Sequence, residues 1–206
     1  KFAGHTYTSL DWTGNPSKDM NINDLGELNK RYTGRLQIIK NNFGYSPVLR
    51  IQDTERTAPE FSKLNLSPDI KDKLNRIFMN PTGIILIAGA TGNGKTTTIY
   101  ACLENLVKVR PFDRIEEVSK PVEVRLDYIS QISLEDNGAL DFAHVLEAQT
   151  RRNAKVIFLG EFNSSKSARF GVDAALQSKL LISTIHTDSV SMIPDRLKGL
   201  AISDPA

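Results

Sequence analysis

The second half of the chain alternates short runs of apolar residues with longer stretches in which apolar residues recur every three or four positions. Consecutive apolar positions are typical of strands that are buried on both faces of a mainly parallel sheet. We predict such strands over residues 84–88, 155–159 and 180–185, and two more near 113–117 and 128–132. The alternation of strands and helices predicts an α/β fold from residue 83 onward.

The stretch that follows the first of these strands has a clear helical pattern. Its apolar residues are spaced so that they form one stripe along a helix, which we expect to lie on the sheet. The stripe consists of Ile99, Cys102, Leu103, Leu106 and Val107.

The first part of the chain has a different pattern. Residues 35–40 and 46–51 read as two short strands on either side of the turn-rich sequence NNFGY, which indicates a β-hairpin. We expect residues 1–55 to form a small α+β domain. Residues 56–82 then read as a linker and one helix, which begins at Ser67-Pro68 and ends before Pro81.

Composition narrows the class of protein. With 40% hydrophobic and 24% charged residues among 206, the chain has the composition of a soluble globular protein. A formal net charge of +2 does not indicate nucleic acid or an anionic membrane as a partner. The single cysteine, Cys102, excludes an intrachain disulfide and makes the reducing cytosol the simplest compartment. The longest apolar run, residues 83–90, is too short to span a bilayer.

One motif carries specific chemistry, the sequence GATGNGKTT between the first buried strand and the amphipathic helix. It fits the pattern G-x-x-x-x-G-K-[ST] in the strand-to-helix context that a P-loop requires, which outweighs the alternative of a glycine-rich turn with an incidental lysine. Its backbone N–H groups would surround the phosphates of ATP, the lysine would reach the β and γ phosphates, and the first threonine would ligate Mg²⁺. The predicted nucleotide-binding residues are Gly89, Ala90, Thr91, Gly92, Asn93, Gly94, Lys95, Thr96 and Thr97.

An NTPase of this kind also needs acidic side chains at the phosphates. Glu161 ends the apolar run KVIFLGE, where it would position the attacking water or act at the metal, and the alternative is a solvated glutamate at a strand end. The segment IEEVSKPVE offers Glu116, Glu117 and Glu123, for which the alternative is an exposed charged loop.

Taken in order, four segments resemble the landmarks of the secretion-superfamily ATPases. GATGNGKTTT resembles the Walker A motif of that family, IEEVSKPVE its acidic box, VIFLGE its Walker B motif and ALQSKLLISTIHTDS its His box, within roughly residues 45–195. The resemblance implies a RecA-like P-loop NTPase core behind a small PAS-like domain, with ATP and Mg²⁺ as ligands. It also implies a homo-hexamer at the cytoplasmic side of the bacterial inner membrane, bound to secretion or pilus machinery and without direct nucleic-acid contact.

The same resemblance implies roles for single residues. His186, flanked by Thr184 and Thr187, matches the His-box histidine, which senses the γ-phosphate region. Glu117 is expected to be a catalytic residue of the acidic box, although Glu116 remains open as the equivalent group. Arg50 resembles a cationic residue that reaches a nucleotide. Other candidates for that role are Arg56, Arg151 and Arg152, although the last two also fit a helix C-terminus.

The chain departs from the family pattern in several places. Phe162, Asn163 and Ser164 stand where the family has an apolar residue, an arginine and an aspartate, and residues 118–120 look like an insertion in the acidic box. The predicted first domain is short and the chain ends soon after the His box, so we expect a C-terminally truncated core over residues 83–206.

Several functions therefore compete. The linker sequence RTAPEFSKLNL resembles the Dot/Icm and plasmid-transfer branch of type IV secretion, which implies a motor. The altered residues after Glu161 favour instead a nucleotide-gated assembly module with little hydrolysis. A small-molecule kinase would need an arginine-rich lid, and a helicase would need basic residues interleaved with aromatic ones, and the sequence shows neither.

Overall fold

The structure is a computed structural model that describes residues 17–20, 32–42, 44–53, 55–134, 145, 148 and 151–201. Its internal contacts divide the chain into two compact units. The first comprises residues 1–56, 123–125 and 135–139, and the second comprises residues 57–122, 126–134 and 140–206.

The first unit contains a three-stranded antiparallel sheet in the order β1-β2-β3. Its strands are β1 (Ser17–Met20), β2 (Tyr32–Asn41) and β3 (Gly44–Asp53). The predicted hairpin is confirmed, because β2 and β3 pair along their whole length from Tyr32 opposite Asp53 to Asn41 opposite Gly44. The predicted helical part of residues 1–55, and with it their PAS-like character, lies outside the described residues.

The second unit is built on a five-stranded sheet in the order β4-β8-β7-β5-β6. Every neighbouring pair in it is parallel, which confirms the predicted α/β fold. Its strands are β4 (Gly83–Ala88), β5 (Ile115–Ser119), β6 (Ser130–Ser133), β7 (Val156–Glu161) and β8 (Leu180–Ile185). Each of these strands overlaps a predicted one, with shifts of at most two residues at the ends.

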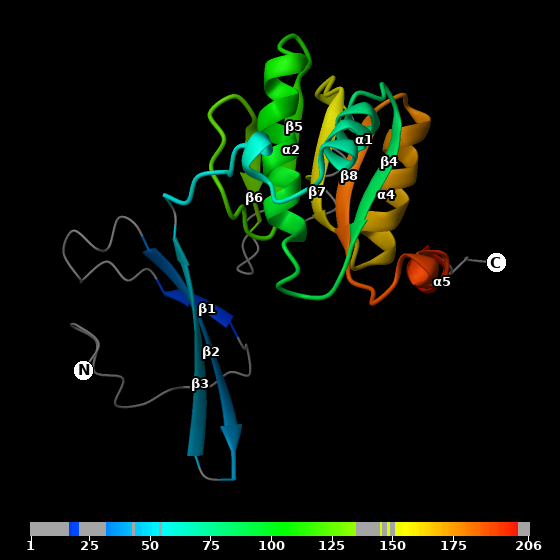
Figure 1. Cartoon of the computed structure of the whole chain (residues 1–206). Helices are drawn as coiled ribbons and strands as arrows, with labels where there is room; N and C mark the ends of the chain where they lie inside the picture. Colours follow the sequence, from blue (N-terminus) through cyan, green and yellow to red (C-terminus); the bar gives the residue numbers. More distant parts are fainter. Residues whose placement is uncertain are drawn as a thin grey trace. The chain divides into compact units, whose positions relative to one another are not determined.

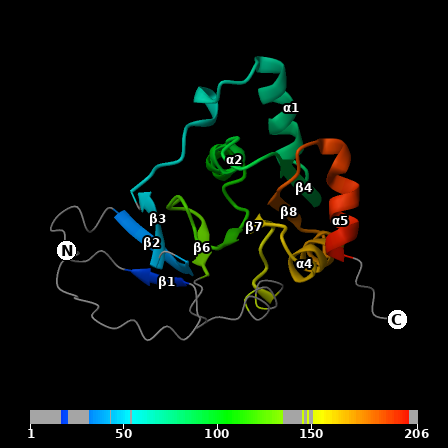
Figure 2. The ribbon, with the colours of Figure 1, turned by 90° about the horizontal axis from the view of Figure 1, so that it is seen from below.

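Helices cover both faces of this sheet, with α1 and α2 on one face and α4 on the other (Figures 1 and 2). Among the described residues, the helices with defined bounds are α1 (Pro68–Phe78), α2 (Lys95–Val109), α4 (Ser165–Leu176) and α5 (Ile193–Ala201). The described part of this unit also contains the short 3₁₀ turns η2 (Phe61–Lys63) and η3 (Val190–Met192). As predicted, α1 follows Ser67 and begins with Pro68, whose fixed φ suits the first turn of a helix.

The core lies where α2 and α4 meet the two central strands. The predicted stripe of α2 is confirmed for Ile99, Leu103 and Leu106, each at most 1% exposed. Strands β7 and β8 bury nearly every side chain, because helices cover both of their faces. This packing holds the carboxyl ends of β4, β8 and β7 at fixed positions.

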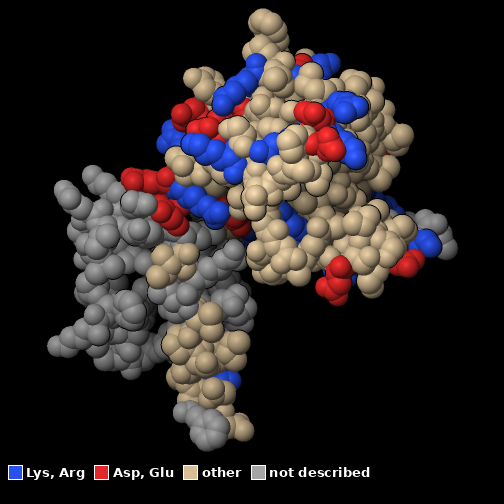
Figure 3. Space-filling model, viewed as in Figure 1, with Lys and Arg blue, Asp and Glu red and all other residues tan. Residues whose placement is uncertain are grey.

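The surface of the second unit carries charges of both signs. On the face shown in Figure 3, the basic and acidic side chains of the described residues are interspersed over the helices. That face therefore presents no broad field of one sign. Among the described residues, no helix is both long enough and apolar enough to cross a bilayer.

Candidate functional site

The P-loop sequence forms the turn between β4 and α2. Strand β4 ends at Ala88, and α2 begins at Lys95 with Gly94 as its N-cap. Gly92 and Gly94 have φ angles of 84° and 78°, a region that side-chain-bearing residues adopt only with strain. The backbone can therefore turn tightly enough to bring its N–H groups and the positive end of α2 to one point, where an anion is stabilised.

Lys95 is folded back over this loop. Only 8% of the residue is exposed, and its Nζ atom lies 2.8 Å from the carbonyl oxygen of Gly89 and 2.9 Å from that of Ala90. Two neutral carbonyl groups leave the ammonium charge uncompensated, so the group is suited to bind phosphate oxygens.

Thr96 is the residue predicted to ligate the metal, and this role stays a prediction. The Thr98 hydroxyl donates a hydrogen bond to the Gly94 carbonyl, whereas the Thr96 hydroxyl has no hydrogen bond to any described residue. Within the part of the chain that the structure describes, no three His, Cys, Asp or Glu side chains gather into a metal site. The Thr96 hydroxyl is an oxygen donor of the kind that suits Mg²⁺, which retains several waters and is usually held by one or two protein groups together with phosphates.

The strand order brings three predicted site residues together. Because β8 lies between β4 and β7, the residue after β8 falls between the P-loop and the end of β7. His186 accordingly places Nδ1 3.5 Å from the Nζ atom of Lys95 and Nε2 3.5 Å from Oε1 of Glu161. His186 and Glu161 are partly exposed, so this row of groups is open to solvent and to a ligand.

The acidic box begins as a buried strand, whereas Glu123, near its end, lies in a partly exposed loop. Glu116 and Glu117 are consecutive residues of β5, they point to opposite faces of the sheet, and both are 0% exposed. Residues 118 and 119, which look like part of an insertion in the sequence, extend this strand. The alternative of an exposed charged loop is therefore wrong for these two glutamates.

Glu117 accepts hydrogen bonds from three side chains, on α2, on β6 and on its own strand β5. Its Oε1 atom lies 2.7 Å from the hydroxyl of Tyr100 on α2 and 2.6 Å from that of Ser119, and its Oε2 atom lies 2.6 Å from Nε2 of Gln131 on β6. The sequence does not identify these three partners of Glu117. No local sequence pattern marks a hydroxyl or amide side chain as a partner of a distant carboxylate before the order of the strands is known.

Glu116 is paired differently. Its Oε1 atom accepts from Nε of Arg114 at 2.6 Å and from Nε of Arg152 at 3.2 Å. Arg152 therefore serves as a partner of a buried carboxylate here, which neither of its predicted roles included.

The other predicted arginines are not brought to the P-loop by anything the structure describes. Arg50 lies in β3 of the first unit, opposite Arg35 on β2, and the structure describes only its backbone. Arg56 and Arg151 are exposed. The assignment of Arg50 to a nucleotide site stays a prediction.

The residues after Glu161 have structural roles of their own. Phe162 is 2% exposed and belongs to the apolar core. Asn163 is exposed, and Ser164 caps α4 by accepting a hydrogen bond from the backbone N–H of Ser167. The position at which the resemblance implies an arginine is thus an uncharged surface residue in this chain.

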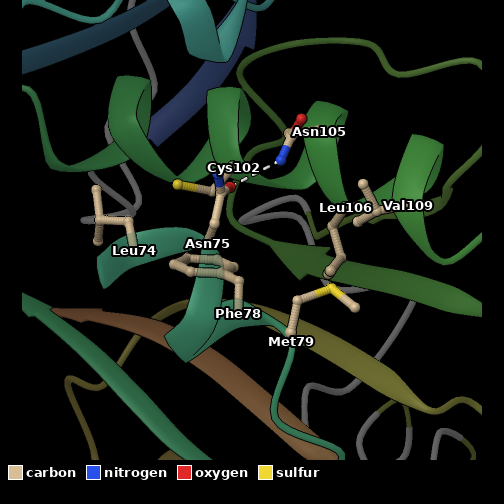
Figure 4. Close-up of a pocket in the computed structure, with 8 residues that line it drawn as sticks. All are labelled: Leu74, Asn75, Phe78, Met79, Cys102, Asn105, Leu106 and Val109. Carbon is tan, nitrogen blue, oxygen red and sulfur yellow. Dashed lines mark hydrogen bonds between the residues drawn. The ribbon is translucent and has the colours of Figure 1, made fainter. Parts of the chain in front are cut away.

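A pocket of about 320 Å³ lies between α1 and α2 (Figure 4). Its walls are mostly apolar, with a hydrogen bond of 2.9 Å from Nδ2 of Asn105 to Oδ1 of Asn75 joining the two helices. It is lined by Leu74, Asn75, Phe78, Met79, Cys102, Asn105, Leu106 and Val109. No P-loop residue lines it, so it is separate from the predicted phosphate site.

Comparison with known proteins identifies relatives. The Type II secretion system protein E of Xanthomonas campestris pv. campestris is 32% identical over 170 residues, which cover 82% of this chain and 30% of that protein. The type IV pilus assembly ATPase PilB of Thermus thermophilus is 29% identical over 168 residues, which cover 82% of this chain and 19% of that protein. The chain spans less than a third of the length of either relative.

A solved structure supports the fold. The Legionella pneumophila ATPase DotB matches with a TM-score of 0.65 and 22% identity, covering 82% of this chain and 46% of that one. The family model described as "Type II/IV secretion system protein" matches residues 20–205, nearly the whole chain. By this match, this chain belongs to the type II/IV secretion system protein family.

Proposed function

We propose that this chain binds ATP with Mg²⁺ and hydrolyses it as the core of an oligomeric secretion or pilus motor. The observation that carries the proposal is the row of Lys95, His186 and Glu161 at the carboxyl ends of three adjacent strands, beside the P-loop. Ligands of α/β proteins bind at this edge of the sheet. The names of the relatives, a type II secretion protein and a pilus assembly ATPase, agree with such a motor.

Each residue has a separate task in this proposal. The loop N–H groups and Lys95 bind phosphate oxygens and stabilise the negative charge that develops on them. Thr96 would hold Mg²⁺, which supplies charge neutralisation between the phosphates, with Glu161 acting on it through a water. Glu161 orients the attacking water and accepts its proton. His186 contacts both Lys95 and Glu161, so its position responds to whatever occupies the space between them.

The proposal extends to the assembly that the chain forms. The family to which the chain belongs supports a homo-hexamer at the cytoplasmic side of the bacterial inner membrane, in contact with secretion or pilus proteins. The likeness to DotB agrees with the Dot/Icm branch in fold, whereas the two relatives above are type II secretion and pilus proteins. A role in conjugative transfer is proposed from the same resemblance to the type IV secretion branch. In a hexamer, Arg50 would reach the nucleotide of a neighbouring subunit.

A nucleotide-gated assembly module is the second candidate. Asn163 favours it, because an exposed amide stands where a subunit-contacting arginine is expected. In such a module, nucleotide binding would set the shape of the assembly, and turnover would be negligible.

Mg²⁺-dependent ATP turnover measured across protein concentration tests the proposal. We expect turnover per subunit to rise with concentration, and Glu161→Gln to lower it by about a hundredfold or more while ATP still binds. Lys95→Ala should weaken ATP binding by about tenfold or more. Lys73→Ala is the control, because it removes one lysine from an exposed position of α1 outside the P-loop. Both ATP binding and turnover should stay at the parent values in this variant. Tight ATP binding without turnover at every concentration would favour the assembly module instead.

A further inference from the structure

Strand β7 carries one extra residue at the point where Glu161 leaves the sheet. Leu159 pairs with Ser183 and Glu161 pairs with Thr184, so Gly160 has no partner of its own on β8. Such a bulge bends a strand and changes the direction of the side chains that follow it. With regular alternation, Glu161 would share the face of Leu159, which is 1% exposed in the apolar core.

Thr184 holds this bulge from both sides of Glu161. Its hydroxyl donates a hydrogen bond of 2.7 Å to the carbonyl of Gly160, the residue before Glu161. Its own carbonyl accepts a bond of 2.8 Å from the N–H of Phe162, the residue after Glu161. Thr184 is 5% exposed, so water has little access to compete for the Gly160 carbonyl.

Gly160 is confined from its other side as well. A methyl group at its Cβ position would lie 2.9 Å from the hydroxyl oxygen and 3.2 Å from Cβ of Ser119 on β5. Strand β5 thus limits the bulge on one side while Thr184 on β8 fixes it on the other. The extra residue has little room to shift.

We propose that Thr184 is a positioning residue for Glu161. The Thr184 hydroxyl fixes the bulge at Gly160 and so directs the Glu161 carboxylate toward His186. The proposal rests on the proposed function, in which Glu161 orients the attacking water. A loosened bulge would let the carboxylate move away from that position, and displacement of about 1 Å can cost about a hundredfold in rate.

Ser183 provides a matched control on the same strand. Its hydroxyl donates a bond of 2.6 Å to the carbonyl of Leu159, and the residue is fully buried. The bond is of the same kind, but it joins the two strands at Leu159, the last regular pair before the shift, and the hydroxyl also makes a longer contact of 3.4 Å with the Thr184 carbonyl. Loss of this bond should affect the stability of the sheet without redirecting Glu161.

The experiment compares Thr184→Val, Thr184→Ser and Ser183→Ala in the full chain. We expect Thr184→Val to lower kcat by about a hundredfold with little change in ATP affinity, and Thr184→Ser to restore most of the rate. Ser183→Ala should retain kcat within about threefold of the parent, even if its melting temperature falls as far as that of Thr184→Val. Equal losses of kcat in Thr184→Val and Ser183→Ala, or no loss in Thr184→Val, would overturn the proposal.

A second readout keeps the two proposals separable. The ring nitrogen resonances of His186, identified by their absence in His186→Gln, report on the adjacent Glu161 carboxylate without any turnover. We expect Thr184→Val to shift them in the direction that Glu161→Gln does, whereas Thr184→Ser and Ser183→Ala leave them near the parent values. If the parent chain does not hydrolyse ATP, the proposed function fails. The role of Thr184 then depends on this spectrum, and unchanged resonances in Thr184→Val would refute it.

Discussion

Gly171 on α4 lies directly against the ring of Phe162. A methyl group at the Cβ position of Gly171 would be 2.3 Å from Cζ of that ring and 2.7 Å from Cδ2 of Leu181. The ring therefore occupies the space that any other side chain at position 171 would need. Because Phe162 directly follows Glu161, this contact also joins α4 to the strand that carries the proposed catalytic glutamate.

We predict that Gly171→Ala destabilises the protein by about 1–3 kcal/mol in urea unfolding, because the core would have to shift to admit the methyl group. Gly199→Ala on α5 is the matched control, since nothing lies within 4 Å of its Cβ position. That change should be neutral or stabilise by up to about 1 kcal/mol, as alanine favours helix. Replacing Phe162 by Leu in the Gly171→Ala background should recover part of the loss. Equal effects at positions 171 and 199 would contradict the prediction.

The sequence was sufficient to predict the parallel sheet and the hairpin. Runs such as residues 84–88 and 180–185 are apolar at nearly every position, a pattern typical of strands covered on both faces. Strand β8 fits this expectation, whereas β4 ends the strand order and leaves Ile84 39% exposed, so its predicted full burial is wrong. Helix α4 has no comparable pattern. It contains Ser165, Ser167 and Gly171, which are poor helix formers, and its capping by Ser164 and its packing on β8 determine its formation.

The candidate site was predicted in part. Lys95 and Thr96 follow from the P-loop motif alone, whereas His186 required the family resemblance, because the strand order that places it beside Lys95 is not written in any local pattern. The bulge at Gly160 and the burial of Glu117 depend on how three strands pack against one another. Side chains such as Thr184 and Tyr100 acquire their roles only through that packing, so the sequence could not single them out.

A test of Glu117 separates a structural role from a catalytic one. We predict that Glu117→Gln lowers the free energy of unfolding by about 1–3 kcal/mol, because an amide cannot accept all three donors and leaves one of them unpaired in the core. Tyr100→Phe, which removes one donor and retains the ring against Phe158, should cost less. Urea unfolding of both variants at neutral pH measures the difference.

The catalytic role predicted for Glu117 would give the opposite pattern. Turnover measured well below the melting temperature would then fall by about a hundredfold or more in Glu117→Gln, while its stability matched that of the parent. Tyr100→Phe serves as the control, because it alters the surroundings of the carboxylate without removing its charge. Unchanged stability in Glu117→Gln would show that the buried hydrogen bonds contribute little.

Cys102 offers a probe of the pocket between α1 and α2. Burial raises the pKa of its thiol to about 12, so the group stays protonated and unreactive at neutral pH. We predict that iodoacetamide modifies Cys102 very slowly in the native protein at about pH 8 and rapidly once denaturant exposes it, where the ordinary pKa is about 8.5. The native rate should rise about tenfold per pH unit toward alkaline pH. Fast native labelling at neutral pH would show that α1 separates readily from α2.

Arg50 can be tested for action between subunits by mixing two inactive variants. If Arg50 of one subunit completes the site of its neighbour, Arg50→Ala and Lys95→Ala should each abolish most of the turnover when alone. In a mixed assembly, a subunit with an intact P-loop can border a subunit with an intact Arg50, and the site between them is then complete. If assembly is random and each site works independently, an equal mixture should recover roughly a quarter of the parent turnover. Mixing Lys95→Ala with Glu161→Gln is the control, because both changes affect the same site and no combination restores it. Recovery in neither mixture, with assembly confirmed by sedimentation, would place Arg50 in its own subunit's site or outside the chemistry.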